Sequence, residues 1–471
     1  MKYKYDFASK QELDIIHKYA MKTLEEVGVR YHDDAGLEIF KKHGFKVEGE
    51  TVFITEDAVW KALETVPKQY DWYGRNGHVT IGGGKTICAP TYGNINVLEN
   101  GDYHPVGKTD YLNFLKLVAT SPVLDVANPN LADFSFIQKE HGSNWAQAMT
   151  LMHDTHPTVG MVDGTKSAHD SITMTQEFLG IYDKPVVAGL ISTSSPLHVS
   201  GAMVQALIEY SEKNQIMFMS SAAMPGLTSP GSLGSMLMLN NAEILSAIVL
   251  SQLINPGVPV MYGIQSHGSD LRYVTPCVGS PEQSLIFAAT KSLGNYYGLP
   301  VRTGGLSGDS KQVDMQTGVE SFSTGFVTLH SEADFMVHAC GGMDQDCTIS
   351  YDKFIYDEEV IQSCRRILMG IEITEEAMLF DCVKEIGPGG NFMSLSEDNL
   401  DDSFEYYQDE TLKLTCASHN TSSSWLAEGK ETVLDRTTAI YQKRLEEYQM
   451  PEMDKDQFDV LKKFVPEEML K

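Results

Sequence analysis

Residues 300–320 read Pro-Val-Arg-Thr-Gly-Gly-Leu-Ser-Gly-Asp-Ser-Lys-Gln-Val-Asp-Met-Gln-Thr-Gly-Val-Glu. They predict a short buried strand over 301–303, a break at Gly304-Gly305, a polar loop, and a helix beginning near Val313. In α/β enzymes the chemistry lies at the carboxyl ends of the strands. The candidate catalytic residues are therefore the polar residues of this loop: Asp309, Ser310, Lys311 and Asp314. The competing interpretation is an ordinary turn in which Asp309 or Ser310 caps the helix.

The same alternation of strand and helix continues on both sides of this stretch. Short apolar strands are predicted at 87–91, 125–130, 157–163, 185–191, 215–222, 258–264, 300–305 and 334–340. Helices are predicted at 109–120 (with Thr109 as N-cap), 142–154, 167–181, 197–213, 232–254, 280–297, 314–330 and 356–369. Eight such units favour an α/β fold, a TIM (β/α)8 barrel. An open doubly wound sheet is the alternative, but no GxGxxG sequence follows a predicted strand.

The two ends of the chain differ from this central pattern. Residues 1–85 predict an N-terminal helical cap with short strands, and residues 86–370 form the barrel that carries the catalytic site. Residues 371–471 predict a C-terminal helical extension that packs on the barrel or at a subunit interface. Neither end shows a catalytic pattern.

Composition narrows the class of protein. The chain of 471 residues has 36 basic and 64 acidic side chains, a net charge of -28, which argues against nucleic acid or an anionic membrane as partner. No stretch approaches the roughly 20 uninterrupted apolar residues of a membrane helix, and the first residues lack a signal-peptide core. The 7 cysteines form no CxxC pair. We therefore expect a cytoplasmic protein with no protein-bound metal.

Two kinds of catalytic site can be drawn from the polar residues alone. Asp309 and Asp314 are close enough in sequence to act as the acid and base of a hydrolase. His267 and His338, together with these aspartates, have side chains of the type that bind a divalent metal, but no HExxH-like spacing supports this. The longest loop after a strand, 265–278, also carries Arg272 and Tyr273.

Aromatic residues gather near the predicted strand ends. An aromatic face encloses a quaternary ammonium well, because the cation meets the ring quadrupole without needing hydrogen-bond partners, and each contact contributes about 0.5–2 kcal/mol when desolvated. The alternative is that most of these rings pack between strands and helices. The candidates are Tyr92, Phe134, Phe136, Trp145, Tyr262, Tyr273, Phe354 and Tyr356.

Several short motifs resemble the trimethylamine:corrinoid methyltransferase family over nearly the whole chain. They are Ile15 to His17 with Leu24 to Val29, Val66-Pro67 with Arg75, Lys108-Thr109-Asp110, Gly305 to Glu320, Ser350 to Phe354 with Asp357-Glu358-Glu359, and Gly387-Pro388-Gly389-Gly390. The resemblance implies a TIM barrel. Founding members of the family carry pyrrolysine, whereas this chain has standard residues only and so resembles the branch that demethylates betaines. The family's histidine after the Gly387 turn is Asn391 here, and no role is assigned to it.

The resemblance implies transfer of a methyl group from a quaternary amine to Co(I) of a corrinoid (cobalamin) held on a separate, cognate corrinoid protein, feeding one-carbon metabolism. Glycine betaine, proline betaine, carnitine and γ-butyrobetaine are the implied substrates, and a homo-oligomer is the implied assembly. On this view Tyr92 and Tyr262, with Phe354 or Tyr356, enclose the ammonium, and His267, Arg272 or His338 holds the carboxylate. The loop from Asp309 to Asp314 lies beside the reacting methyl group.

Two other classes remain open at this point. One is a hydrolytic or S-adenosylmethionine-linked TIM-barrel enzyme, which turns over without a corrinoid protein. The other is a betaine-binding protein without activity, which binds a ligand that never loses a methyl group.

Overall fold

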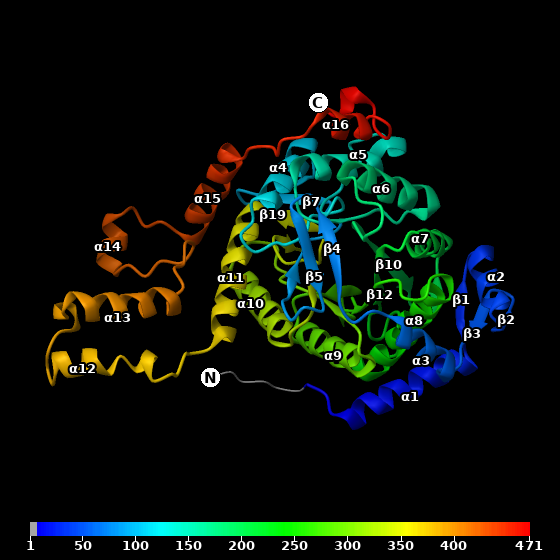
Figure 1. Cartoon of the computed structure of the whole chain (residues 1–471), viewed down its shortest axis with the longest axis horizontal. Helices are drawn as coiled ribbons and strands as arrows, with labels where there is room; N and C mark the ends of the chain where they lie inside the picture. Colours follow the sequence, from blue (N-terminus) through cyan, green and yellow to red (C-terminus); the bar gives the residue numbers. More distant parts are fainter. Residues whose placement is uncertain (1–6) are drawn as a thin grey trace.

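A curved sheet of parallel strands forms the centre of the protein (Figure 1). The structure is a computed structural model that describes residues 7–471; residues 1–6, where the sequence lacks a signal-peptide core, lie outside this range. In sheet order the central strands are β9 (Thr158–Val159), β10 (Val187–Ser194), β12 (Ile216–Ala222), β13 (Val260–Ile264), β16 (Val301–Gly304), β17 (Phe335–Val337) and β6 (Ile87–Cys88). Each pairs parallel with the next.

Helices surround these strands, as the alternating sequence predicts. They are α4 (Lys108–Ala119), α5 (Lys139–His153), α6 (Gly164–Leu179), α7 (Gly201–Glu212), α8 (Leu233–Ile254), α9 (Pro281–Tyr297), α10 (Met315–His330) and α11 (Tyr351–Met369). Helix α8 is apolar enough for a membrane span by length and composition, but 78% of its apolar window is buried inside the protein. It is a core helix.

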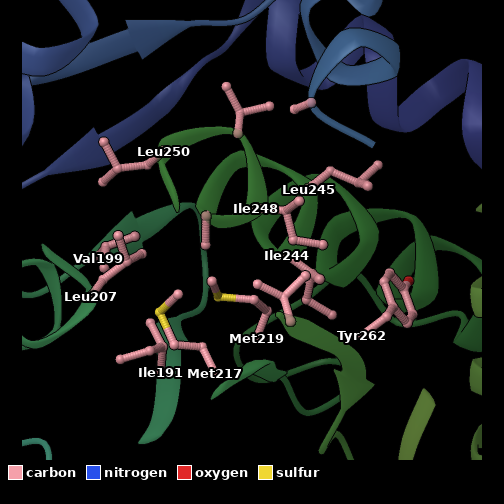
Figure 2. Close-up of a cluster of buried hydrophobic side chains, with 14 of the residues drawn as sticks. Ile191, Val199, Leu207, Met217, Met219, Ile244, Leu245, Ile248, Leu250 and Tyr262 are labelled. Atoms are coloured by element: carbon pink, nitrogen blue, oxygen red, sulfur yellow. The ribbon is translucent and has the colours of Figure 1, made fainter. Parts of the chain in front are cut away.

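Alternation along each strand divides the core into two layers. Met217, Met219 and Tyr262 face helix α8, where they meet Ile244 and Ile248 (Figure 2). Their neighbours on the same strands, such as Ile216, Phe218 and Met261, belong to a separate cluster on the opposite face of the sheet. This division follows from the two-residue period of a strand.

The second cluster lies on the concave side of the sheet. Phe218 of β12 stacks on Phe335 of β17 with ring centroids 4.8 Å apart, although two strands separate β12 from β17 in the sheet. Trp72, from the hairpin of β4 (Tyr70–Gly74) and β5 (Gly77–Ile81), contacts both rings at 5.9 and 6.1 Å. The sheet therefore curls around this cluster, and the hairpin covers one end of it.

The strand predicted at 125–130 is not formed as predicted. Only Ala127 makes a bridge, to Thr158 of β9. Backbone hydrogen bonds nevertheless join this segment to β6 through Asp125 N–H and Cys88 O (2.8 Å), and to β9 through Val159 N–H and Ala127 O (3.0 Å). Pro129 has no N–H to extend the ladder, so regular pairing ends here.

The N-terminal region joins the same sheet. It consists of α1 (Lys10–Glu26), β1 (Val29–Tyr31), α2 (Asp34–Lys42), β2 (Lys46–Glu48), β3 (Thr51–Phe53) and α3 (Glu56–Thr65). Strand β1 pairs parallel with β11 (His198–Val199), and α1 and α3 pack on α8. Helix α4 begins at Lys108 with Gly107 at its N-cap, so the expected Thr109 cap is wrong: Asp110 reaches back to accept the Gly107 N–H at 3.0 Å.

The C-terminal residues fall into two parts. Helix α15 (Val433–Glu447) packs on α11 and α4, and α16 (Lys455–Leu461) packs on α6. Between α11 and α15, the helices α12 (Phe380–Ile386), α13 (Glu397–Glu410) and α14 (Ser422–Ala427) extend away from the body as an arm (orange in Figure 1). Short strands complete the fold near the carboxyl ends of the central strands: β7 (Asn96–Glu99), β8 (Asp102–Pro105), β14 (Gly268–Asp270), β15 (Thr275–Cys277), β18 (Gly342–Met343) and β19 (Thr348–Ser350).

Candidate active site

A buried arginine lies on the concave side of the sheet. Arg302 of β16 is 2% exposed, and its Nη1 and Nη2 donate to Ser220 Oγ and Gln265 Oε1, each at 2.8 Å. Both acceptors are uncharged, and the ion pairs of residues 7–471 do not include Arg302. Burial lowers the pKa of Arg302 to about 10, so the guanidinium remains a cation at neutral pH.

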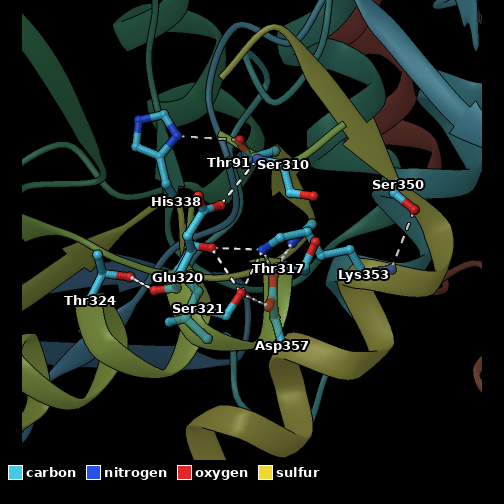
Figure 3. A network of polar contacts seen from close by, with 12 residues as sticks. Thr91, Ser310, Thr317, Glu320, Ser321, Thr324, His338, Ser350, Lys353 and Asp357 are labelled. Atoms are coloured by element: carbon cyan, nitrogen blue, oxygen red, sulfur yellow. Dashed lines mark hydrogen bonds and ion pairs between the residues drawn. The ribbon is translucent and has the colours of Figure 1, made fainter. Parts of the chain in front are cut away.

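Two histidines approach Arg302 from neighbouring strand ends. His338, directly after β17, is buried, with Nδ1 3.3 Å from Thr91 Oγ1 and 3.4 Å from Asp346 Oδ1 (Figure 3). Burial lowers the pKa of His338; Asp346 opposes this shift, and the nearby Arg302 and His267 add to it. His338 is therefore neutral at pH 7.

The second histidine, His267, is oriented by a glutamine. Its Nδ1 lies 2.9 Å from Gln283 Oε1, while Gln283 Nε2 donates to Ser266 O at 3.1 Å. This arrangement places the proton of a neutral His267 on Nδ1 and leaves Nε2 as an acceptor.

Tyr92 follows β6 at the same end of the sheet. Its ring packs against the concave-side cluster. Burial raises the pKa of its hydroxyl, Asp163 raises it further, and the positive charge of Arg302 opposes both. Of the aromatic candidates, Tyr92 is the one that packs against the concave-side cluster.

Buried polar atoms meet beside Gly342. A Cβ at Gly342 would lie 2.6 Å from Ser307 Oγ, 2.9 Å from Thr91 Oγ1 and 3.5 Å from Asp346 Oδ1. Ser307 Oγ and Asp346 Oδ1 are both buried, and neither makes a hydrogen bond. Asp346 Oδ1 still has His338 Nδ1 at 3.4 Å, whereas Ser307 Oγ makes no polar contact within residues 7–471. Buried polar atoms are nearly always satisfied, so Ser307 Oγ marks a place for a polar ligand.

The four predicted catalytic residues lie together in the loop after β16, but two of them are held by backbone groups. Asp309 accepts the N–H groups of Val278 and Gly279, both at 2.9 Å, and so joins this loop to the one after β13. Asp314, not Asp309 or Ser310, is the N-cap of α10, which begins at Met315; its Oδ1 accepts the N–H groups of Gln316 and Thr317. Carboxylates used in this way are poorly placed for acid–base work.

The other two residues of the loop also have local partners. The Ser310 hydroxyl donates to Gln312 O and Asp314 Oδ1, and the exposed Lys311 pairs with Asp344 at 2.9 Å. Glu320 of α10 clamps the loop from below by accepting the N–H groups of Asp309 (2.8 Å) and Ser310 (3.1 Å). These contacts hold the loop after β16 in place.

A buried ion pair supports the same loop. Lys353 and Asp357 of α11 are both fully buried and 2.6 Å apart (Figure 3). Lys353 Nζ also donates to Leu306 O at 2.7 Å, and Asp357 accepts the Gly341 N–H at 2.8 Å. The pair therefore holds Leu306, in the loop after β16, and Gly341, in the loop after β17.

The remaining predicted residues lie away from this group. Tyr262 is on the helix side of β13, where its hydroxyl donates to Asn241 at 2.9 Å. Phe354 is buried among α4 and α11 side chains, and Tyr356 packs between α10 and α11. Arg272 and Tyr273, at the exposed tip of the β14–β15 hairpin, pair with Asp270 and with each other; Arg272 lowers the Asp270 pKa to about 2. These five do not line the buried site.

Comparison with known proteins shows which family this chain is related to. The trimethylamine methyltransferase (MTTB) family matches residues 2–469. The chain belongs to this family. It is 33% identical to the glycine betaine methyltransferase of Desulfitobacterium hafniense over 96% of this chain and 94% of that protein. It is 34% identical to the proline betaine:corrinoid methyltransferase of Eubacterium limosum over 98% and 97%.

The structural comparison agrees on the fold. The crystal structure of the Methanosarcina barkeri monomethylamine methyltransferase matches with a TM-score of 0.51 at 12% identity, covering 93% of this chain and 98% of that one. At this identity the likeness concerns the fold only.

Proposed function

We propose that this protein transfers a methyl group from a betaine-type quaternary amine to the Co(I) corrinoid of a separate protein. The observation that carries the proposal is the match to two betaine methyltransferases over almost the full length of all three chains. We extend the substrate class to carnitine and γ-butyrobetaine, and we expect the activity to serve one-carbon metabolism in the cytoplasm.

We further propose that the parallel strands and the segment 125–127 form a closed TIM (β/α)8 barrel. The hydrogen bonds of this segment to β6 on one side and to β9 on the other support closure. Within this barrel, residues 86–370 are the catalytic domain, with a cap at 1–85 and an extension at 371–471. The arm of the extension exposes Phe380, Phe392, Met393, Phe404 and Tyr407, which supports its use between copies in a homo-oligomer.

The reaction requires little acid–base catalysis by the protein. Co(I) is a strong nucleophile and a neutral tertiary amine leaves, so the protein's task is to orient the ammonium and exclude water. Tyr92 offers a ring face to the ammonium. Neutral His338 adds no positive charge beside the ammonium. The loop from Asp309 to Asp314 is held in place by Glu320.

The proposal is tested by incubating the purified protein with Co(I) cobalamin and a panel of methylated amines, and by following the visible spectrum. Formation of methylcobalamin with one betaine and none with trimethylamine supports the proposal. Binding of a betaine without any methyl transfer, also with candidate corrinoid proteins, would leave a binding protein instead.

A further inference from the structure

We infer that Arg302 is the residue that binds the substrate, through the carboxylate of a zwitterionic betaine. This inference rests on the proposed function and adds to it a specificity-determining residue and a requirement for a carboxylate. It comes from a charge imbalance inside the protein, which the motifs of the sequence do not reveal.

The imbalance is clear from the two buried cations of the described chain. Among residues 7–471, the buried Lys and Arg side chains are Lys353 and Arg302. Lys353 has its counter-ion, Asp357, at 2.6 Å. Arg302 has only a hydroxyl and an amide oxygen. A buried cation without an anion is costly in free energy, and an anionic ligand at this position offsets that cost.

The geometry keeps the guanidinium ready for such a ligand. Gly263 gives the side chain room, because a Cβ there would lie 3.2 Å from Arg302 Cδ. Ser220 and Gln265, from the two neighbouring strands, each hold one Nη atom. Residues 7–471 provide no acceptor for the remaining N–H groups, so they are available for the planar fork that a carboxylate recognises.

The surroundings fit the other half of the ligand. Tyr92 packs against the concave-side cluster, which contains Phe335, and Arg302 is the register partner of Phe335 on the neighbouring strand. A betaine whose carboxylate meets Arg302 has an aromatic side chain on the same side of the sheet for its ammonium. A cation without a carboxylate, such as choline or trimethylammonium, instead meets an uncompensated guanidinium. Such a site rejects ligands that leave its buried polar group unpaired.

Calorimetric binding to the full-length protein tests the inference without methyl transfer. Glycine betaine has the carboxylate that Arg302 is inferred to bind, and choline lacks it. We expect wild-type protein to prefer glycine betaine by at least about 10-fold. The variant Gln265→Glu keeps the side-chain shape but gives Arg302 an internal partner, so glycine betaine affinity should fall at least about 10-fold while choline affinity does not fall.

Two further variants and a control complete the test. Arg302→Met should remove the preference for glycine betaine, and Arg302→Lys, which keeps the charge but loses the fork, should retain part of it. Lys85→Met removes an exposed cation beside Asp125 and should change affinity less than about twofold. If Arg302→Met does not fold, the inference is tested by the affinities of Gln265→Glu and of the wild-type protein for glycine betaine and choline.

The outcomes separate this inference from the proposed function. Three results would overturn the inference. They are equal affinity of the wild-type protein for choline and glycine betaine, no betaine binding at all, and undiminished betaine binding in Gln265→Glu and the Arg302 variants. Betaine binding that depends on Arg302 without methyl transfer supports the inference and rejects the proposed function. Methyl transfer with an unchanged KM for betaine in the Arg302 variants supports the proposed function and rejects the inference.

Discussion

Removing the ammonium of Lys353 tests how the loop after β16 is supported. The variant Lys353→Met leaves Asp357 fully buried with the Ser321 hydroxyl and the Gly341 N–H as its hydrogen-bond donors. Breaking a buried pair by removing one partner costs about 3–5 kcal/mol, because the remaining charge is uncompensated. We expect this loss in the free energy of unfolding, measured by urea titration with tryptophan fluorescence.

The double variant Lys353→Met/Asp357→Asn makes the test specific. Neither residue is then charged, and the Asn amide oxygen still accepts the Gly341 N–H, so the double variant should be more stable than Lys353→Met alone. The coupling energy should exceed about 1 kcal/mol. Costs that add to within about 0.5 kcal/mol would refute the argument, since additivity means that the two side chains do not interact.

The same variant should depend on pH in a defined direction. Burial raises the pKa of Asp357 and Lys353 opposes it, so loss of Lys353 raises the folded-state pKa further above the unfolded value. Stability linked to such a group is present below the unfolded pKa of about 4 and is lost as pH rises toward the folded pKa. The deficit of Lys353→Met relative to wild type should therefore be smallest near pH 4 and grow toward pH 7.

Three further predictions concern the site and the core. Because burial lowers the pKa of His338 below its ordinary value, betaine affinity should show no inflection from His338 between about pH 7 and 8 in calorimetry, and an inflection in this range that His338→Gln abolishes would contradict this. Gly342→Ala places a methyl group against Ser307 Oγ and should weaken betaine binding at least about 10-fold, whereas Gly231→Ala, with nothing within 4 Å, should not. Trp72→Ala should lower the free energy of unfolding by about 3–5 kcal/mol in urea titration; a loss below 1 kcal/mol would mean that the hairpin does not pack on Phe218 and Phe335.

The position of most strands and helices could be predicted from the sequence. The apolar run 258–264, which follows Gly257, corresponds to β13, because buried parallel strands need apolar residues on both faces. The strand predicted at 125–130 is not formed as predicted, and the reason is physical. Its composition is apolar at Val126 and Ala127, but the Asn128 side-chain amide donates to Thr91 O, and Pro129 has no N–H with which to continue a ladder.

The candidate site was less predictable, because residue type alone does not say which face of a strand a side chain occupies. Tyr262 was chosen for its ring, yet it shares the helix side of the sheet with Met217 and Met219. Its neighbour Gly263 faces the site and leaves room for Arg302. A signal for Arg302 did exist: it is the one charged residue in an otherwise apolar strand, and charge in such a place calls for a partner.

The loop after β16 shows the opposite error. Asp309, Ser310, Lys311 and Asp314 look catalytic because polar residues follow a strand. Their partners, such as the Val278 and Gly279 N–H groups and the helix α10 N-terminus, come from segments whose proximity depends on the tertiary fold. Sequence spacing places these four residues in one loop, but it could not distinguish side chains that bind a ligand from those that hold the loop.

The most direct test of the account is transfer of an isotopic label. The purified protein is incubated with methyl-¹³C glycine betaine and Co(I) cobalamin or a candidate corrinoid protein, and both products are followed by NMR. The account predicts that labelled methylcobalamin and the demethylated amine appear in equal amounts, with no transfer from labelled trimethylamine. Demethylation without labelled cobalamin, or transfer from trimethylamine as fast as from the betaine, would contradict it.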